Sequence, residues 1–215
     1  RTIIQSLKMS EIEKYENAKK VLLGLRLATD EKWAKLCENN ISSILNDHAW
    51  CEQKAASNAI SVITKFPMHT DLVEALTKIA LEELEHFDMV LEKMKERGVK
   101  LQYECKDNYV GELYKYMLSE GGSKENQLVS RMLFSAMIEA RSCERFRLLT
   151  EKLTDPDLVE FYRELMISEA HHYTTFLKFA RKYGGNIDVD ARWQKFLDFE
   201  GEVIKRYGIV ETMHG

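Results

Sequence analysis

The chain is poor in the residues that interrupt helices. Its 215 residues include only two prolines, Pro67 and Pro156, and 10 glycines. Proline and glycine are the least favourable residues in helix interiors, so their scarcity permits long helices. The sequence also lacks the alternation of polar and apolar residues that is typical of strands. We therefore expect an all-α fold.

Other features that are missing disfavour several classes of protein. No apolar run reaches the roughly 18–20 residues that span a membrane, so no membrane partner is expected. Lysine and arginine number 31 against 35 acidic residues, giving a net charge of −4. Without an overall basic excess, a nucleic-acid partner would need a local patch. The four cysteines form no C-x-x-C pair, which favours reduced thiols in a cytoplasmic protein.

What the chain does have is Glu-x-x-His, twice, at Glu83–His86 and Glu169–His172. Residues i and i+3 share a helix face, so each copy aims a carboxylate and an imidazole at one point. Each copy follows another glutamate by about 30 residues, Glu52 in the first half and Glu139 in the second. Two such helices, with two more that each supply one glutamate, make the ligand set of a di-iron or di-manganese carboxylate site.

Turn and capping residues divide the chain into helices. The four long helices are predicted at about 30–66, 70–97, 123–153 and 156–183, and shorter ones at 10–26, 107–119 and 188–207. Tight turns at 67–69 and 154–155 make two antiparallel hairpins. The link between the hairpins is long, and such a crossover is a feature of ferritin-like four-helix bundles. Residues 1–215 are thus expected to form a single ferritin-like domain with extra terminal helices.

The counterpart of Glu52 in the second half is ambiguous, because Cys51-Glu52 recurs as Cys143-Glu144. Facing residues in an antiparallel hairpin lie equally far from the turn. Glu52 and Glu139 each lie 14 residues before the predicted end of their helix, whereas Glu144 lies only 9 before it. Glu139 is therefore the predicted ligand, and Glu144 is expected to pair with a nearby arginine.

An alternative explanation of the glutamates in apolar stripes is a set of buried ion pairs, with Lys54 or Arg141 as partners. However, four carboxylates gathered in a core without cations would repel one another, and two divalent cations relieve this. Carboxylates with one histidine per metal and no thiolate suit iron or manganese better than zinc. The predicted metal ligands are Glu52, Glu83, His86, Glu139, Glu169 and His172.

A group of basic residues lies close to these positions in the sequence. Arg141, Arg145 and Arg147 surround the helix turn after Glu139, and Lys54 follows Glu52. One interpretation is ion pairing within the protein. The other is a clamp for substrate phosphates near the mouth of the metal site. Both interpretations stay open at this point.

Five segments go beyond generic spacing. They are DHAWCEQKAA (47–56), LEELEH (81–86), KERGV (95–99), IEARSCERF (138–146) and SEAHHY (168–173). Together they resemble the MiaE-type tRNA hydroxylases, and the likeness extends from about residue 33 to residue 183. The first 28 residues and the last helix do not obviously match.

The resemblance implies a specific activity. Members of this family hydroxylate the isopentenyl group of 2-methylthio-N6-isopentenyladenosine beside the tRNA anticodon, with two iron ions and O2. It implies that the six residues named above hold the iron, that tRNA is a partner, and that an external electron donor is needed. Two other classes remain, a ferroxidase or peroxide scavenger of the ferritin or rubrerythrin kind and a metal-free helical interaction protein. Metal content and a tRNA substrate would distinguish them.

Overall fold

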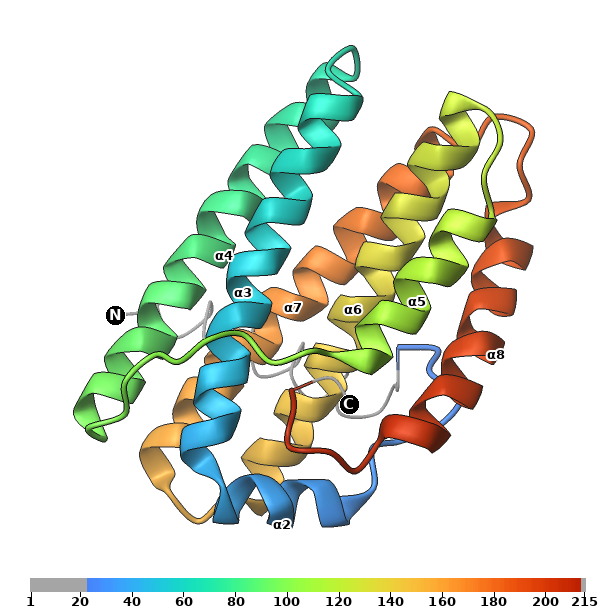
Figure 1. Ribbon diagram of the computed structural model, residues 1–215. Coiled ribbons are helices and arrows are strands. Elements are labelled where there is room, and N and C mark those ends of the chain that lie inside the picture. The colour runs from blue at the N-terminus through green and yellow to red at the C-terminus, as the bar shows by residue number, and fades with distance from the viewer. Residues whose placement is uncertain (1–22, 214–215) are drawn as a thin grey trace, which may run out of the picture.

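The computed structural model describes residues 23–213, and within that range it contains seven α-helices and no strand (Figure 1). The helices are α2 (Glu31–Asn39), α3 (Ile41–Lys65), α4 (Thr70–Glu96), α5 (Asn108–Ser119), α6 (Lys124–Lys152), α7 (Pro156–Lys182) and α8 (Val189–Tyr207). The all-α prediction is confirmed. The helix expected at 10–26 falls mostly outside the described residues, and residues 23–26 form turns and a bend instead. No described helix is both long and apolar enough to cross a bilayer.

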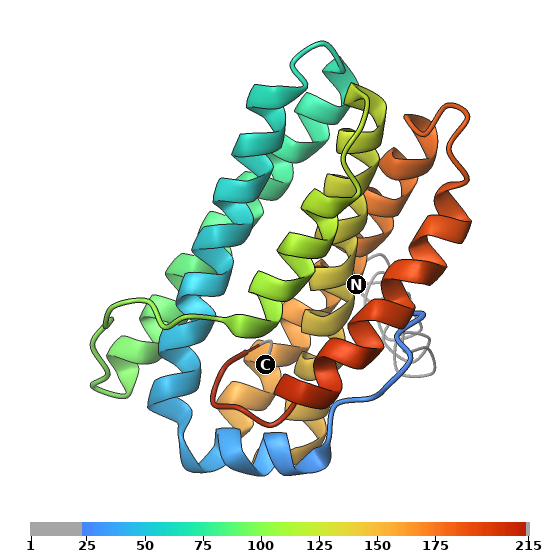
Figure 2. The ribbon, with the colours of Figure 1, turned by 45° about the vertical axis from the view of Figure 1, so that its right-hand side comes forward.

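Two antiparallel hairpins form the bundle, α3 with α4 and α6 with α7 (Figure 2). The second turn is well specified, because the Asp155 side chain accepts a hydrogen bond from the backbone of Asp157 and Pro156 occupies the first turn of α7. Gly98 has a φ of 66°, which suits the end of α4 and would strain a residue with a side chain. The chain then crosses α3 and enters α5, which packs with α8 on the outer side of α6.

The helix predicted over 30–66 is broken at Asn40, and this boundary is a correction. The Asn40 side chain donates a hydrogen bond to the Leu36 carbonyl at 2.9 Å, and its backbone N–H donates to the Cys37 carbonyl. Asparagine side chains compete with the helix for backbone partners, which favours such a break. Consequently α2 lies across the end of the bundle rather than extending α3 (Figure 1).

The core consists of two apolar clusters with a polar layer between them. One cluster includes Leu76 and Phe176, and the other includes Phe146 and Leu165. On α3, α4 and α7, the predicted ligand positions fall between the residues of the first cluster and those of the second, and on α6 Glu139 lies at the end of the stretch that belongs to the first cluster. The packing of the two hairpins therefore brings four separate glutamate-bearing stretches to one level.

Candidate metal centre

All six predicted ligand side chains are buried in this polar layer, and they form two overlapping groups. The first group is Glu52, Glu83, His86 and Glu169. The second group is Glu83, Glu139, Glu169 and His172. In each group, one nitrogen or oxygen per residue lies within 4.8 Å of those of the other members. Because Glu83 and Glu169 belong to both groups, the arrangement is that of two neighbouring ion sites that share two carboxylates.

Both histidines turn their Nδ1 atom toward the carboxylates. His172 Nδ1 lies 3.0 Å from Glu83 Oε1, while its Nε2 lies 2.7 Å from Glu82 Oε2 on the outer side. His86 Nδ1 lies 3.3 Å from Glu83 and 3.7 Å from Glu169. A histidine that binds a metal through one nitrogen usually gives the other N–H to a carboxylate. Glu82 supplies such a partner to His172.

The centre contains buried polar atoms that lack a hydrogen bond. They are Glu83 Oε1, Glu169 Oε1 and His172 Nδ1; the first and the last of these lie 3.0 Å apart, but without the geometry of a hydrogen bond. Buried polar atoms in proteins nearly always have a hydrogen-bond partner. Metal ions would satisfy these three atoms, and the oxygen and imidazole donors suit iron or manganese, since neither group contains a cysteine. The residues therefore fit a pair of such ions.

Burial, repulsion between carboxylates and hydrogen bonds to the histidines together shift the pKa values in the centre, and the hydrogen bonds hold the pKa of Glu83 below its ordinary value despite burial. Burial raises the pKa of Glu52 to about 8, and burial together with the charge of Glu83 raises the pKa of Glu169 to about 7. Burial and then the charge of Glu169 raise the pKa of Glu139 well above its ordinary value. Burial would lower the pKa of His86, but hydrogen bonds to Glu52 and Glu83 outweigh it and raise the pKa to about 11. Divalent cations would favour the ionised carboxylates instead.

His48 supports the centre from behind Glu52. Its Nε2 lies 2.6 Å from Glu52 Oε1, and its ring is stacked on Tyr162 at a centroid distance of 5.6 Å. Burial lowers the pKa of the imidazole to about 3, so the ring is neutral. The neutral ring can donate its Nε2 proton to the carboxylate and hold Glu52 in its orientation.

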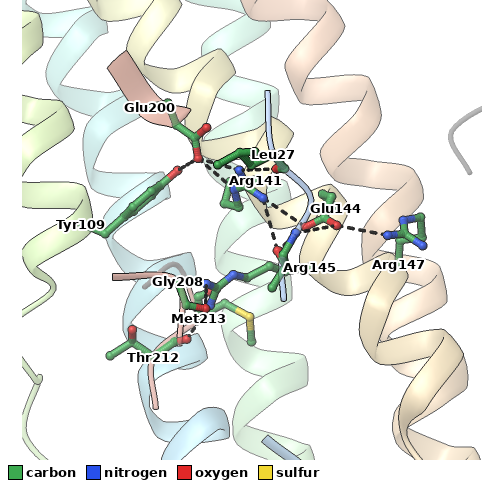
Figure 3. A network of polar contacts seen from close by, with 11 residues as sticks. Leu27, Tyr109, Arg141, Glu144, Arg145, Arg147, Glu200, Gly208, Thr212 and Met213 are labelled. Carbon is green, nitrogen blue, oxygen red and sulfur yellow. Dashed lines mark hydrogen bonds and ion pairs between the residues drawn. The ribbon is translucent and has the colours of Figure 1, made fainter. Parts of the chain in front are cut away.

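Glu144 lies outside both groups and pairs with arginines, as the turn-distance argument predicted. Its carboxylate lies 3.2 Å from the guanidinium of Arg141 and 3.1 Å from that of Arg147 (Figure 3). Its Oε1 also accepts a hydrogen bond from the backbone of Thr29 at 3.2 Å. The carboxylate that joins the buried cluster from α6 is that of Glu139.

Arg141 and Arg145 are completely buried, which contradicts their predicted contact with substrate phosphates. Both side chains reach outward from α6 into the terminal parts of the chain (Figure 3). Arg141 Nη2 lies 2.7 Å from Glu200 Oε1 on α8 and also donates to the Leu27 carbonyl. Arg145 donates to carbonyls of the C-terminal segment, among them that of Thr212 at 3.0 Å. Protein groups thus occupy the positions that phosphates would need.

The other two predicted basic residues are partly exposed. Arg147 pairs with Glu144 and Glu151 on its own helix. Lys54 lines a pocket beside the metal centre and lies 2.7 Å from Glu104. Of the four predicted basic residues, Lys54 alone is among the residues that line this pocket.

Two acidic residues of the centre and its surroundings escaped the sequence reasoning. Glu200 falls at helical spacing with the apolar residues Phe196, Val203 and Ile204, all of which are buried. An acidic residue within such an apolar stripe was a signal that could have identified it. Glu82 carries no such signal, because it is one of three glutamates within residues 82–85, and only the packing of α4 against α7 brings it to His172.

The pocket has a volume of about 80 Å³ and is lined by residues of all four bundle helices and of α5. Its apolar lining consists of Ala55, Ile79, Val110, Phe134, Ile138 and Phe176. Glu83 and Glu139 form part of its buried wall, while Lys54 and Asn58 are partly exposed. An apolar group that entered this pocket would meet the metal centre at its inner end.

Two hairpins that share a carboxylate–histidine centre define a ferritin-like protein of the di-metal type. Within that class, the chain belongs to the MiaE family. The family model described as tRNA-(MS[2]IO[6]A)-hydroxylase (MiaE) matches residues 16–215. The resemblance noted from the sequence is therefore confirmed, and the match includes the last helix, which the sequence motifs did not cover.

Known proteins support the same assignment. A tRNA 2-(methylsulfanyl)-N(6)-isopentenyladenosine(37) hydroxylase of Pseudomonas putida is 40% identical over 161 residues, covering 75% of this chain and 77% of the relative. A hydroxylase of the same name from Salmonella typhimurium is 26% identical over 233 residues, covering 86% and 84%. Among solved structures, "Protein 43 with aldehyde deformylating oxygenase activity from Synechococcus" matches with a TM-score of 0.81 and 30% identity, covering 89% of this chain and 95% of that one.

Proposed function

We propose that the protein hydroxylates the isopentenyl group of 2-methylthio-N6-isopentenyladenosine next to the tRNA anticodon, with two iron ions and O2. Membership of the MiaE family and the named hydroxylases among its relatives support the reaction and the substrate. The observation that carries the metal assignment is the pair of buried groups that overlap at Glu83 and Glu169. We assign the reaction to the cytoplasm, where tRNA is found. The four cysteines are free thiols, which agrees with this assignment.

The six buried residues divide naturally between two ions. Glu52 and His86 would help to hold one iron and Glu139 and His172 the other, while Glu83 and Glu169, which belong to both groups, lie within reach of both ions. When bound, the iron pair supplies the activation of O2 that attack on a C–H bond requires. His48 and Glu82 hold Glu52 and His172 from outside the centre.

The pocket residues position the substrate. Val110, Phe134 and Phe176 provide an apolar surface for the branched hydrocarbon tail. Because Glu83 and Glu139 close the inner end of the pocket, the terminal methyl groups of the tail would lie against the metal centre. Filling the pocket with the tail expels water from this end, which protects the reaction from competing chemistry.

The reaction requires electrons from another protein or small molecule. Hydroxylation by O2 places one oxygen atom in the product and releases the other as water, which consumes two electrons and two protons. The sequence carries no motif for a flavin, nicotinamide or iron–sulfur reductase. An external electron donor is therefore part of the proposal.

The test combines product analysis with metal analysis. Iron-loaded protein, O2 and an electron donor are incubated with tRNA from a strain that lacks the hydroxylated nucleoside. Mass spectrometry of the digested tRNA should show one added oxygen on the isopentenyl group. Absence of that product together with fast hydrogen peroxide turnover would favour a peroxide scavenger instead.

Metal analysis tests the ligand assignment separately. The wild-type protein should bind about two irons per chain. Glu83→Ala and His172→Ala should lose them, because each removes a donor that no neighbour replaces. Glu144→Gln is the matched control, since Glu144 lies on the same helix as Glu139 but pairs with arginines, and it should retain full iron content. Full loading of His172→Ala would refute the assignment.

A further inference from the structure

The segment that joins α4 to α5 borders the mouth of the pocket. It crosses α3 (Figures 1 and 2). Its last residue, Asp107, lines the pocket. Lys54 on α3 also lines the pocket, and its ammonium lies 2.7 Å from Glu104 of this segment. A macromolecule that placed one modified base in the pocket would therefore lie against this segment.

Tyr103 lies on this segment between two residues that contact α3. The Gln102 N–H donates to Asn46 Oδ1 at 2.7 Å, and its carbonyl accepts from Trp50 Nε1 at 2.9 Å. On the other side, Glu104 is held by its ion pair to α3. Between these anchors, the Tyr103 side chain is 94% exposed. The protein thus holds an aromatic ring in solvent on a segment that is attached to α3, beside the pocket.

Exposed lysines accompany this ring. Lys100 and Lys106 lie on either side of Tyr103 in the segment, and Lys54 adds a partly exposed ammonium at the pocket itself. Aromatic rings that stack on bases, together with cations that contact phosphates, are the means by which proteins bind single-stranded loops. Since the whole chain carries a net charge of −4, such contacts have to be local, as they are here.

We propose that residues 100–106, together with Lys54, form the docking surface for the unpaired loop nucleotides of the tRNA substrate. Tyr103 stacks on a base that neighbours the modified adenosine, and the lysines contact the flanking phosphates. This inference rests on the proposed function, because the prenyl group must occupy the pocket for the loop to reach the segment. It replaces Arg141 and Arg145, which lie inside the protein.

The test measures binding of a fluorescent anticodon stem–loop that carries the isopentenylated adenosine to the iron-loaded full chain without O2. Tyr103→Ala should weaken the Kd about tenfold, the effect of losing one base–aromatic stack. Tyr103→Phe keeps the ring and should bind within about twofold of wild type. Lys106→Ala should make the slope of log Kd against log salt concentration shallower by about 0.7, the effect of losing one phosphate contact to a single strand. Lys195→Ala, an exposed lysine on α8, is the matched control and should leave it unchanged.

A second ligand separates stacking from a general structural defect. A stem–loop with an abasic nucleotide beside the modified adenosine should bind wild type about tenfold more weakly than the intact loop. Tyr103→Ala should bind the intact and abasic loops equally. An unchanged Kd for Tyr103→Ala, or an abasic penalty that persists in that variant, would overturn the docking surface.

Product formation distinguishes the two proposals. If wild type binds the loop but does not hydroxylate it, the proposed function fails, and the Kd values of the variants still decide the docking surface. If wild type hydroxylates the tRNA and the variants bind normally, the function stands and the docking surface is wrong. If wild type does not bind the loop, both are wrong.

Discussion

Arg141 and Glu200 form a buried ion pair between α6 and α8, and we expect its disruption to be costly. The atoms Nη2 and Oε1 are 2.7 Å apart, and neither side chain has exposed surface. Arg141→Met leaves the Glu200 carboxylate buried with the Tyr109 hydroxyl, which donates to it at 2.8 Å. Removing one partner of a buried pair typically costs about 3–5 kcal/mol, because the other charge is left uncompensated. At about 2–4 °C per kcal/mol for a chain of this size, the Tm should fall by about 6–20 °C.

Replacing the other partner, Glu200, should reduce the stability less. Glu200→Met leaves Arg141 with Glu144 at 3.2 Å and the Leu27 carbonyl at 3.0 Å, so the guanidinium keeps acceptors. In the double variant Arg141→Met, Glu200→Met, no charge of this pair remains, and apolar replacements of buried pairs are often neutral or stabilising. The double variant should therefore be more stable than Arg141→Met alone.

Thermal and urea unfolding of the four proteins, followed by circular dichroism at fixed iron content, measures these differences. Fixed iron content matters because a bound metal itself stabilises the folded state. Two results would refute the reasoning. One is an Arg141→Met protein within about 1 kcal/mol of wild type, below the cost expected for a broken buried pair. The other is a double variant whose loss of stability equals the sum of the single losses, because the two side chains would then not interact.

Three further outcomes follow from the structure. Maleimide should label the exposed Cys105 in the native protein. Cys37 should react only after unfolding, because its thiol is buried and burial raises its pKa to about 12. Peptide mass spectrometry measures both reactions. Burial raises the pKa of Asp107 from 3.8 to about 6, so the folded state binds the proton more tightly and this group's contribution to stability falls as the pH rises through that window. Asp107→Asn keeps a side chain that can cap the helix. In urea unfolding, its free energy of unfolding should therefore exceed that of wild type by about 1–2 kcal/mol at pH 8 and by little at pH 4. Glu104→Gln removes the charge that competes with phosphates for Lys54, while the amide oxygen can still accept a hydrogen bond from the Lys54 ammonium and hold the segment to α3. Stem–loop affinity in the anisotropy assay should therefore rise by about two- to fourfold, and a weaker Kd would contradict the docking surface.

The buried carboxylate–histidine cluster was predictable because it depends on local periodicity and on distance from a turn. Glu139 was separated from Glu144 by counting residues, which works because both hairpins consist of long antiparallel helices. The break at Asn40 was not predictable in the same way, since an asparagine side chain can face solvent or end a helix. Distant contacts decide it, because Trp33 on α2 packs on Arg145 and donates to a carbonyl of the C-terminal segment.

The arginines were misjudged because their partners are remote in the sequence. Glu200 is 59 residues from Arg141, and Arg145 reaches carbonyls at the end of the described chain. A run of charges on a helix usually marks a solvated face. Here α5 and α8 cover the outer side of α6, so the run points into protein rather than into water. Nothing in local periodicity indicates that an additional layer of helices will cover that side.

The two sides of α6 illustrate what separates a binding site from a structural ion pair. A buried charge is costly unless an opposite charge or hydrogen bonds offset it. Toward the bundle axis, Glu139 faces Glu169 and further carboxylates, and the two histidines of the layer are too few to balance them. Toward α8, Arg141 meets Glu200, and the chain itself supplies the opposite charge. The inner side therefore needs protons or cations from solution and the outer side does not, so the sign of the neighbouring charges, rather than burial, distinguishes Glu139 from Glu144 as the candidate ligand.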